Sequence, residues 1–356
     1  MELGICVASK IDDIDYLVRA EALGYTHAWI ADSHMLWSDP YAVLALAATR
    51  TKRMRLGTGV AVAPTRPAPV TAASIATINQ LAPGRVFLGV GTGNTAMRVM
   101  GHKPMPIAEF DAWLTTVKPL LRGEEADFQW RGKTMPIRHL MPEAGFVNFA
   151  DPIPLYVSGF GPRALGLVGK HADGAVLSIP PDAKYMAGVW RHIERGAEAA
   201  GRALDRARFR AASLTTLVVL NPGEAPDSPR VRRLCGAFAM ASLHYTYDRW
   251  RQTGQPPGQA VAGLWTDFCA HMARFPEERR HQYVHRGHNC WVEPEEERFL
   301  TRELMTSTCM IGTASELVER LGALGDAGLD EVTLLPPLEP RYEVIEQVAS
   351  EVLSRL

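Results

Sequence analysis

The chain has 356 residues, of which 47% are hydrophobic, and its formal net charge is −1 at pH 7. This apolar content can supply a full core and excludes a largely disordered chain, while the near-neutral charge gives no strong field for binding nucleic acid or membrane surfaces. No apolar run approaches the roughly 20 residues that a membrane-spanning helix needs. The five cysteines are scattered without a CxxC pair, and the first residues lead directly into a strand, so we expect a reduced, cytoplasmic protein.

Eight strand-like runs alternate with helical patterns along the chain. The predicted strands are residues 3–8, 27–31, 55–60, 86–90, 155–158, 174–178, 211–220 and 331–335. The predicted helices are residues 11–23, 40–49, 69–81, 107–121, 162–170, 183–200, a long stretch from 231, 315–327 and 342–356. This one-for-one alternation predicts a (β/α)8 TIM barrel formed by residues 1–356 as a single domain. A doubly wound open sheet is the alternative.

Two segments are longer than a barrel requires. Residues 123–152 are aromatic, basic and interrupted by prolines, and they predict a hairpin or long loop after the fourth strand. Residues 221–307 predict several helices between the seventh and eighth strands and are rich in aromatic and histidine side chains. Because long insertions on barrel loops commonly shape the active site, we expect the 221–307 segment to cover it.

The segment from Arg55 to Asn94 carries the strongest functional signal. It has the pattern strand, polar loop, helix, strand and glycine loop, which predicts a right-handed βαβ unit. Both loops leave the carboxyl ends of strands, where α/β folds bind ligands. The second loop is Gly91-Thr92-Gly93-Asn94, and a similar loop, Ser158-Gly159-Phe160-Gly161, follows the fifth strand and leads into a helix. Backbone N–H groups in such loops can bind a phosphorylated or bulky flat ligand.

An acidic side chain, an imidazole and an indole follow the second strand, at Asp32, His34 and Trp37. A redox site needs a proton donor or relay beside a planar ring, and an aromatic wall that excludes water. Asp32 or His34 could supply the first and Trp37 the second. The alternative is that Asp32 caps the next segment and that His34 is an ordinary loop residue.

Further side chains are candidates for contact with a substrate. Arg66, between prolines after the third strand, could bind an anionic group bidentately or lie on the surface, and Tyr41 adds a phenol to the same rim. His281, His285 and His288 have a spacing that would place them on one face of a helix, as zinc ligands can be. No carboxylate or cysteine completes that set, so we expect no metal. We expect His285 and His288 to line the substrate pocket, and a purely structural role for the histidines is the alternative.

Four segments together resemble the luciferase-like superfamily of flavin-using oxidoreductases. They are AWIADSHMLWSDPYAVLALAA, Met54–Val60 continuing to GRVFLGVGTGN, IPLYVSGFGPRALGLVGKHADG and IGTASELVERLGALGDAGLDEVTLLPP. The branch that the chain resembles most is the methylenetetrahydromethanopterin reductase type, which uses a deazaflavin coenzyme. The resemblance covers residues 1–220 and 308–356, and it implies a barrel with a flavin or deazaflavin at its carboxyl rim.

The resemblance also implies roles for individual residues. Asp32 would lie near the polar edge of the cofactor ring. Gly59, Val60 and Ala61 would form a bulge against the ring face, which the family builds with a non-proline cis peptide. The two glycine loops would hold the side chain and phosphate of the cofactor.

One departure from the family pattern concerns the loop after the second strand. Many relatives have a histidine directly after the acidic residue, whereas this chain has Ser33 there and His34 one residue later. If the strand continued regularly, this shift would point the imidazole of His34 to the opposite face from Asp32.

Two chemistries fit such a barrel, and the sequence leaves the choice between them open. Reduced coenzyme F420 could pass a hydride to an imine, carbonyl or activated alkene, with the protein supplying positioning and a proton. Reduced FMN could instead activate oxygen for a monooxygenase in a pocket kept dry by the aromatic insertion. The predicted partners are a small-molecule substrate, a second copy of the chain in a homodimer and, for FMN, a flavin reductase.

Two other classes of protein are kept as alternatives. One is a flavin-binding barrel without turnover, acting as a subunit of a larger assembly, although the ionisable groups on the rim argue against it. The other is a non-flavin barrel lyase or aldolase, which would need a lysine at a strand end for Schiff-base chemistry. The predicted strand ends offer no lysine.

Overall fold

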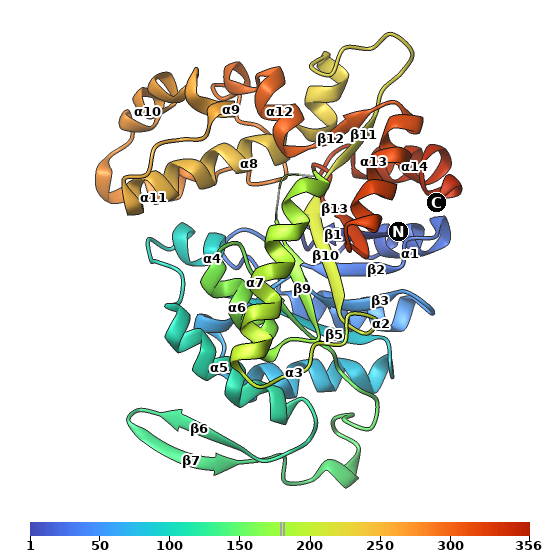
Figure 1. Cartoon of the computed structure of the whole chain (residues 1–356), viewed down its shortest axis with the longest axis vertical. Coiled ribbons are helices and arrows are strands. Elements are labelled where there is room, and N and C mark those ends of the chain that lie inside the picture. Colours follow the sequence, from blue (N-terminus) through green and yellow to red (C-terminus); the bar gives the residue numbers. More distant parts are fainter. Residues whose placement is uncertain (179, 181) are drawn as a thin grey trace.

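The computed structural model describes residues 1–178, 180 and 182–356, and in this part of the chain eight parallel strands close into a barrel (Figure 1). The first strand pairs with both the second and the last, which closes the ring, as in the Cα partners Glu2 and Glu331. The predicted TIM barrel is therefore confirmed and the open sheet is excluded. The barrel strands are β1 (Glu2–Val7), β2 (His27–Ile30), β3 (Arg55–Thr58), β5 (Val86–Gly91), β8 (Leu155–Ser158), β9 (Gly174–Leu177), β10 (Arg210–Thr215) and β13 (Glu331–Leu334).

Helices on the outside of the barrel connect successive strands. Their starts follow the capping signals of the sequence: Asp39 accepts hydrogen bonds from the N–H groups of Tyr41 and Ala42, and Thr313 and Glu316 form a capping box. The connecting helices are α1 (Asp15–Leu23), α2 (Pro40–Arg50), α3 (Ala68–Leu81), α4 (Asn94–Val99), α5 (Ile107–Leu120), α6 (Pro162–His171), α7 (Met186–Ala199), α13 (Ala314–Asp326) and α14 (Arg341–Glu351). The first helix begins four residues later than predicted, the last ends at Glu351, and the short helix α4 was not predicted.

The seventh predicted strand, residues 211–220, is wrong as a single element. It divides at Thr216 into β10 of the barrel and β11 (Leu217–Val219), which leaves the barrel and pairs with β12 (Met310–Gly312). Thr216 itself is fully buried, as are its neighbours. Because the β-branched residues Thr215 and Thr216 at the division suit a strand as well as their apolar neighbours do, sequence pattern alone could not reveal the change of partner or the short strand β12.

The two predicted insertions lie at opposite ends of the molecule in Figure 1. The hairpin is β6 (Ala126–Trp130) paired antiparallel with β7 (Lys133–Ile137), and it extends away from the barrel. The long insertion between β10 and β13 is mainly helical, as predicted. Its helices are α8 (Pro229–Thr253), α9 (Gln259–Ala262), α10 (Trp265–Ala273), α11 (His281–Val284) and α12 (Arg302–Thr308).

Aromatic rings fill the interior of the barrel. The ring centroids of Trp29 and Phe87 are 4.4 Å apart, and those of Phe87 and Tyr156 are 5.2 Å apart. Below them the fully buried carboxylate of Glu331 accepts hydrogen bonds from Trp29 Nε1 at 2.8 Å and from Arg210 Nη2 at 2.8 Å. The interior is therefore packed rather than hollow, so a ligand cannot bind inside the barrel. In barrels of this type the active site lies at the carboxyl rim.

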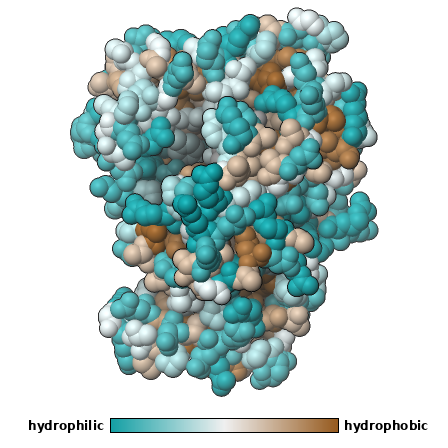
Figure 2. All heavy atoms as spheres, in the orientation of Figure 1, coloured by the Kyte–Doolittle hydropathy of each residue, from teal (hydrophilic) through white to brown (hydrophobic). Residues whose placement is uncertain are grey.

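The face of the molecule shown in Figure 2 is mostly hydrophilic, and its hydrophobic side chains form small, separate groups. Among the described residues, no helix combines the length and the apolar character that crossing a membrane requires.

Candidate active site at the carboxyl rim

Three turns at the carboxyl rim meet at one place. A Cβ atom built on Gly91 would lie 3.0 Å from Val60 Cγ2 and 3.4 Å from Ser158 Cβ, so the turns after β3, β5 and β8 are in contact. The peptide bond between Gly59 and Val60 is cis, at the position that the resemblance implied. Beyond it, Ala61 begins the short strand β4 (Ala61–Val62), which pairs with the end of β5. Gly59, Val60 and Ser158 all keep partial exposure at the ends of buried strands.

Asp32 is buried beside these turns. Its side chain is 1% exposed, and its Oδ2 accepts hydrogen bonds from Arg66 Nη1 at 2.7 Å and from the N–H of Val62 at 3.2 Å. Its other oxygen, Oδ1, is buried without a hydrogen-bond partner among the described residues. A buried acceptor of this kind is costly unless a ligand or water satisfies it.

Arg66 binds two carboxylates of the protein itself. Besides Asp32 it contacts Asp39, with 2.5 Å between Nη2 and Oδ2, and its guanidinium lies 4.9 Å from the ring centroid of Tyr41. Trp113 Nε1 donates to the backbone oxygen of Arg66 at 3.1 Å and fixes the loop. Burial and the nearby Asp32 charge raise the pKa of Tyr41, so its phenol stays protonated. In this arrangement Arg66 holds Asp32 in place.

His34 lies on the same side of the loop as Asp32. Its Nδ1 is 3.7 Å from Asp32 Oδ1, and its Nε2 is buried without a partner among the residues described. The expectation that His34 points to the opposite face is wrong, because β2 ends at Ile30 and the alternation of a strand no longer applies.

Two glycine loops complete the rim. Gly93 has a φ of +79° at the start of α4, where a Cβ would lie 2.7 Å from Val62 Cγ1, so this tight turn favours glycine. Gly161 precedes α6 and has no side chain to cap it, which leaves the first N–H groups of the helix available to an anion. A Cβ on Gly161 would meet no atom within 4 Å, so the space beside this helix start is open. Phe160, in the same loop, is 60% exposed.

The long insertion contacts this rim through a row of hydrogen-bonded side chains. Thr95, just after the Gly91–Asn94 loop, lies 2.5 Å from the hydroxyl of Tyr245 on α8, and that hydroxyl lies 3.2 Å from His288 Nε2. His288 in turn stacks on Trp37 with ring centroids 5.8 Å apart. Trp37 also donates from Nε1 to Cys290 Sγ at 3.3 Å. The indole of Trp37, which the sequence predicts to shield the site from water, is therefore held in place by the insertion.

The protonation of this row follows from its last member, Asp248. A carboxylate can only accept, so His285 Nε2 donates to Asp248 Oδ2 at 2.7 Å. Burial lowers the pKa of both His285 and His288, which keeps the two rings neutral. His285 Nδ1 is then an acceptor and His288 Nδ1 donates to it at 3.3 Å. His288 Nε2 is left to accept from the Tyr245 hydroxyl, so the direction of each hydrogen bond is fixed.

The predicted face of three histidines is only partly correct. His285 and His288 meet, but α11 ends at Val284, so the three side chains do not share a helix face, and His281 lies near Gly101 instead. Sequence reasoning missed Tyr245 and Asp248. Their spacing of three within the long helix α8 was the available signal, because it places both on one face.

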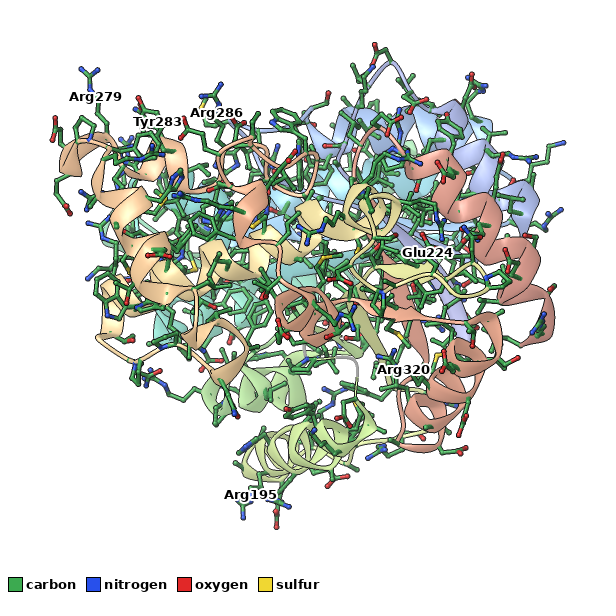
Figure 3. The ribbon with its side chains drawn as sticks, turned by 90° about the horizontal axis from the view of Figure 1, so that it is seen from above. Arg195, Glu224, Arg279, Tyr283, Arg286 and Arg320 are labelled. Atoms are coloured by element: carbon green, nitrogen blue, oxygen red, sulfur yellow. The ribbon has the colours of Figure 1, made fainter. Side chains whose placement is uncertain are left out.

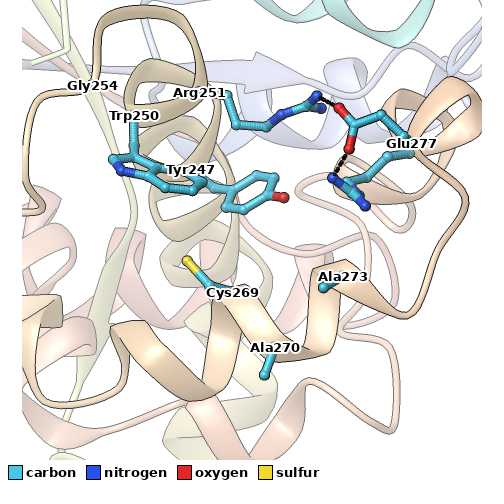
Figure 4. Close-up of a pocket in the computed structure, with 9 residues that line it drawn as sticks. Tyr247, Trp250, Arg251, Gly254, Cys269, Ala270, Ala273 and Glu277 are labelled. Carbon is cyan, nitrogen blue, oxygen red and sulfur yellow. Dashed lines mark hydrogen bonds and ion pairs between the residues drawn. The ribbon is translucent and has the colours of Figure 1, made fainter.

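A separate hollow lies within the insertion, between α8 and α10 (Figure 4). It has a volume of about 670 Å³, with Tyr247, Trp250 and Cys269 on its wall. Glu277 at its edge is paired with both Arg251 and Arg280. None of its lining residues comes from the barrel rim. Figure 3 shows Arg279 projecting from the edge of the same insertion, whereas Tyr283 stacks on Phe275.

The rim residues fit a flavin or deazaflavin. The three turns leave backbone partly exposed where a flat ring could lie, and the start of α6 offers N–H groups to a phosphate. The unpartnered Oδ1 of Asp32 and Nε2 of His34 are polar atoms that a ring edge or substrate could satisfy.

Comparison with known proteins agrees with this geometry. The family model for luciferase-like monooxygenases matches residues 11–331. The 5,10-methylenetetrahydromethanopterin reductase of Archaeoglobus fulgidus is 24% identical over 98% of this chain and 96% of its own length. That of Methanolobus tindarius is 30% identical, over 52% of this chain and only 56% of its own length.

Solved structures share the fold over nearly the whole chain. The coenzyme F420 dependent tetrahydromethanopterin reductase of Methanopyrus kandleri has a TM-score of 0.71 at 19% identity, covering 99% of both chains. The oxygenating constituent of 3,6-diketocamphane monooxygenase from Pseudomonas putida, in complex with FMN, has a TM-score of 0.67 at 18% identity, covering 100% of this chain and 99% of that one. The chain therefore belongs to the luciferase-like monooxygenase family and is an oxidoreductase, with relatives that use coenzyme F420 or FMN.

Proposed function

We propose that this oxidoreductase transfers a hydride between coenzyme F420 and a small organic substrate at the carboxyl rim. The observation that carries the proposal is the contact of the turns after β3, β5 and β8 beside the unpartnered Oδ1 of Asp32. The choice of F420 is supported by the reductase of Archaeoglobus fulgidus, which aligns over almost the whole chain, and by the F420-dependent reductase structure.

The chain's own residues would bind, orient and protonate in this reaction. The bound deazaflavin would supply the hydride. Arg66 and the N–H of Val62 hold Asp32, whose Oδ1 is left free to orient a polar edge of the ligand. His34, with Nδ1 3.7 Å from Asp32 and an unpartnered Nε2, is the group placed to give a proton to the substrate or take one from it.

The long insertion would cover the site and contact the substrate. Trp37 and His288 form a stacked wall that would exclude water, and His285 lies against His288 with ring centroids 5.0 Å apart. Tyr41 lies beside the Arg66 guanidinium. The loops Gly91–Asn94 and Ser158–Gly161 would hold the cofactor side chain and phosphate. Oxygenation with reduced FMN is the second candidate, because a wall that excludes water also suits oxygen chemistry.

Anaerobic titration tests the proposal. The purified protein is titrated with reduced F420, oxidised F420, FMN and reduced FMN, and binding is followed by fluorescence. Tight binding of F420 alone is the expected result, and tight binding of FMN species alone would move the assignment to a monooxygenase. Failure of every carrier to bind at high micromolar concentration would contradict cofactor binding at this rim.

The same proposal includes a cytoplasmic location, a homodimer and, if FMN binds, a flavin reductase as the source of reduced cofactor. Light scattering during size-exclusion chromatography measures the oligomeric state directly. A dimer of about twice the chain's 39.1 kDa is expected, and a monomer would remove the homodimer from the proposal.

A further inference from the structure

A second pocket lies at the amino end of the barrel, away from the carboxyl rim. Its volume is about 490 Å³, which is within the usual size of a small-molecule site. It is formed by the starts of barrel strands, among them Arg55 on β3 and Leu155 on β8, and by the end of the segment that follows the β6–β7 hairpin. Nothing in the proposed redox chemistry uses it.

The charges around this pocket are mostly positive. Four cationic side chains and one carboxylate, that of Asp173, line the pocket. That carboxylate is already engaged, because its Oδ2 accepts from the N–H of Leu155 at 2.9 Å. The four cations are Arg55, Lys118, Arg122 and Arg208.

Two of the four cations form no ion pair among the residues that the structure describes. Arg122 pairs with Glu124 at 3.0 Å and Arg208 lies 3.5 Å from Asp205, whereas Lys118 and Arg55 have no such partner. Lys118 is half-buried and Arg55 is exposed. Burial and the nearby positive charge of Arg202 lower the pKa of Lys118, although the Asp173 carboxylate acts in the opposite direction. A bound anion would stabilise this partly desolvated ammonium.

A hydroxyl donor completes the pocket. Tyr156 is 4% exposed, and its hydroxyl has no hydrogen-bond partner within the described part of the chain. Burial raises the pKa of Tyr156, so the group is a protonated phenol that can donate. Apolar side chains form the remaining wall, including Leu121, Phe149 and Ile153.

We propose that this pocket is a second binding site, for a small organic phosphate. The lining offers ammonium, guanidinium and phenol donors and almost no free acceptor, so the ligand must be an anion. Several cations around one cavity favour a dianion such as a phosphate monoester over a single carboxylate. The apolar wall of Leu121, Phe149 and Ile153 can bury a compact apolar group of the ligand, and inorganic phosphate has no such group.

Calorimetric titration of the full chain with phenyl phosphate and with inorganic phosphate tests the proposal. Wild-type protein is expected to bind phenyl phosphate at least threefold more tightly than inorganic phosphate, because only the ester can occupy the apolar wall. Lys118→Met and Arg55→Met each remove a charge while keeping an apolar stem, and each should weaken phenyl phosphate binding about tenfold. Since Lys118 is unpaired, Lys118→Met should fold at least as stably as wild type.

A matched control separates the pocket from the overall charge. Arg195 projects from α7 into solvent (Figure 3), so Arg195→Met changes the net charge equally and should leave binding unchanged. Unchanged binding in Lys118→Met and Arg55→Met, as would result if the phosphate bound at the start of α6, overturns the proposal. The proposal is also overturned if phenyl phosphate does not bind at concentrations on the order of 10 mM, or if Arg195→Met weakens its binding as much as the two pocket variants do. Loss of F420 and FMN binding would leave these outcomes unaffected, because the rim is not part of this pocket.

Discussion

The two halves of the candidate active site are built in different ways. The turns after β2, β3, β5 and β8 lie side by side because neighbouring parallel strands place their carboxyl ends together. The other half comes from the insertion, whose Tyr245 reaches Thr95 from 150 positions away in the sequence. The rim turns expose backbone and leave Asp32 Oδ1 and His34 Nε2 without a partner among the described residues. In the insertion, by contrast, hydrogen bonds join the side chains of the row from Tyr245 to Asp248. This contrast suggests a rim that binds the cofactor and an insertion that closes and shapes the site.

The largest expected effect comes from removing the charge of Asp32. Asp32→Asn should lower turnover at least about 100-fold, because the Oδ1 carboxylate beside His34 is lost. It should lower the free energy of unfolding by only about 1–3 kcal/mol, since asparagine can still accept from Arg66 and Val62. Turnover on a substrate found by screening and urea denaturation measure the two effects.

Asp39→Asn is the matched control, because Asp39 also pairs with Arg66 but lies half-exposed. Asparagine caps a helix as well as aspartate, so α2 should be unaffected. We expect less than about a threefold change in turnover for a rim pair screened by solvent. Comparable losses of turnover in both variants would show that Arg66, rather than the Asp32 carboxylate, is the group that matters.

Acid should destabilise both the insertion and the barrel through buried neutral histidines. Burial and nearby positive charge lower the pKa of His27 to about 3, and burial lowers the pKa of His288 well below its usual value. The unfolded chain takes up these protons below pH about 6.5 and the folded chain does not, so stability is lost as pH falls from there. His27 should cost about 2 kcal/mol between pH 6.5 and 5, and His288 should add a loss in the same direction.

Urea denaturation across this pH range, for wild type, His27→Gln and His288→Gln, separates the two regions. Each variant should remove its own part of the pH dependence. A wild-type slope that survives in His288→Gln would mean that the insertion holds this imidazole in its charged form, contrary to the hydrogen-bond directions derived above.

A methyl group at the meeting point of the turns should weaken cofactor binding. Gly91→Ala places a Cβ 3.0 Å from Val60 Cγ2 and 3.4 Å from Ser158 Cβ, so the turns must separate slightly. We expect about tenfold weaker binding, equivalent to about 1.4 kcal/mol. Gly322→Ala is the control, because Gly322 is exposed on α13 and its Cβ would meet nothing within 4 Å. Equal weakening by both would argue against a cofactor held at the convergence.

How much could be predicted from the sequence differs between the two halves. The barrel strands and the rim loops were identified because each depends on a local pattern: an apolar run, a glycine loop, a proline at a helix start. The pairing of Arg66 with Asp32 was not identified. It joins two loops that were each predicted from the sequence, but their relative position is set by the order of the strands in the barrel. The sequence therefore indicated Arg66 as a substrate group, whereas the structure engages it with two of the protein's carboxylates.

The insertion was harder to predict from the sequence, for a physical reason. Its helices were predicted only as a class, since their apolar faces pack on one another and no strand register fixes them. The row from Thr95 to Asp248 depends on contacts between residues 37 to 150 positions apart, apart from the neighbouring histidines. Polar side chains in such rows are indistinguishable from surface residues until the tertiary contacts are known.

The smallest expected effect tests whether the Tyr245 hydroxyl ties the insertion to the rim. Tyr245→Phe leaves the Thr95 hydroxyl and His288 Nε2 without this partner, which should lower the free energy of unfolding by about 1–2 kcal/mol. Hydrogen exchange should also become faster in α4, because its contact with α8 is loosened. Burial raises the pKa of Tyr245 to about 12, so the effect should be independent of pH between 7 and 9.

Tyr283→Phe makes the same chemical change at the outer edge of the insertion (Figure 3). The Tyr283 ring stacks on Phe275 with centroids 4.1 Å apart, and phenylalanine keeps that contact. Its hydroxyl has no hydrogen-bond partner among the described residues, so the free energy of unfolding should change by less than about 0.5 kcal/mol. If both variants behave alike, the Tyr245 hydroxyl does not help to hold the insertion to the barrel, and the polar row belongs to the insertion rather than to the junction between the two halves of the site.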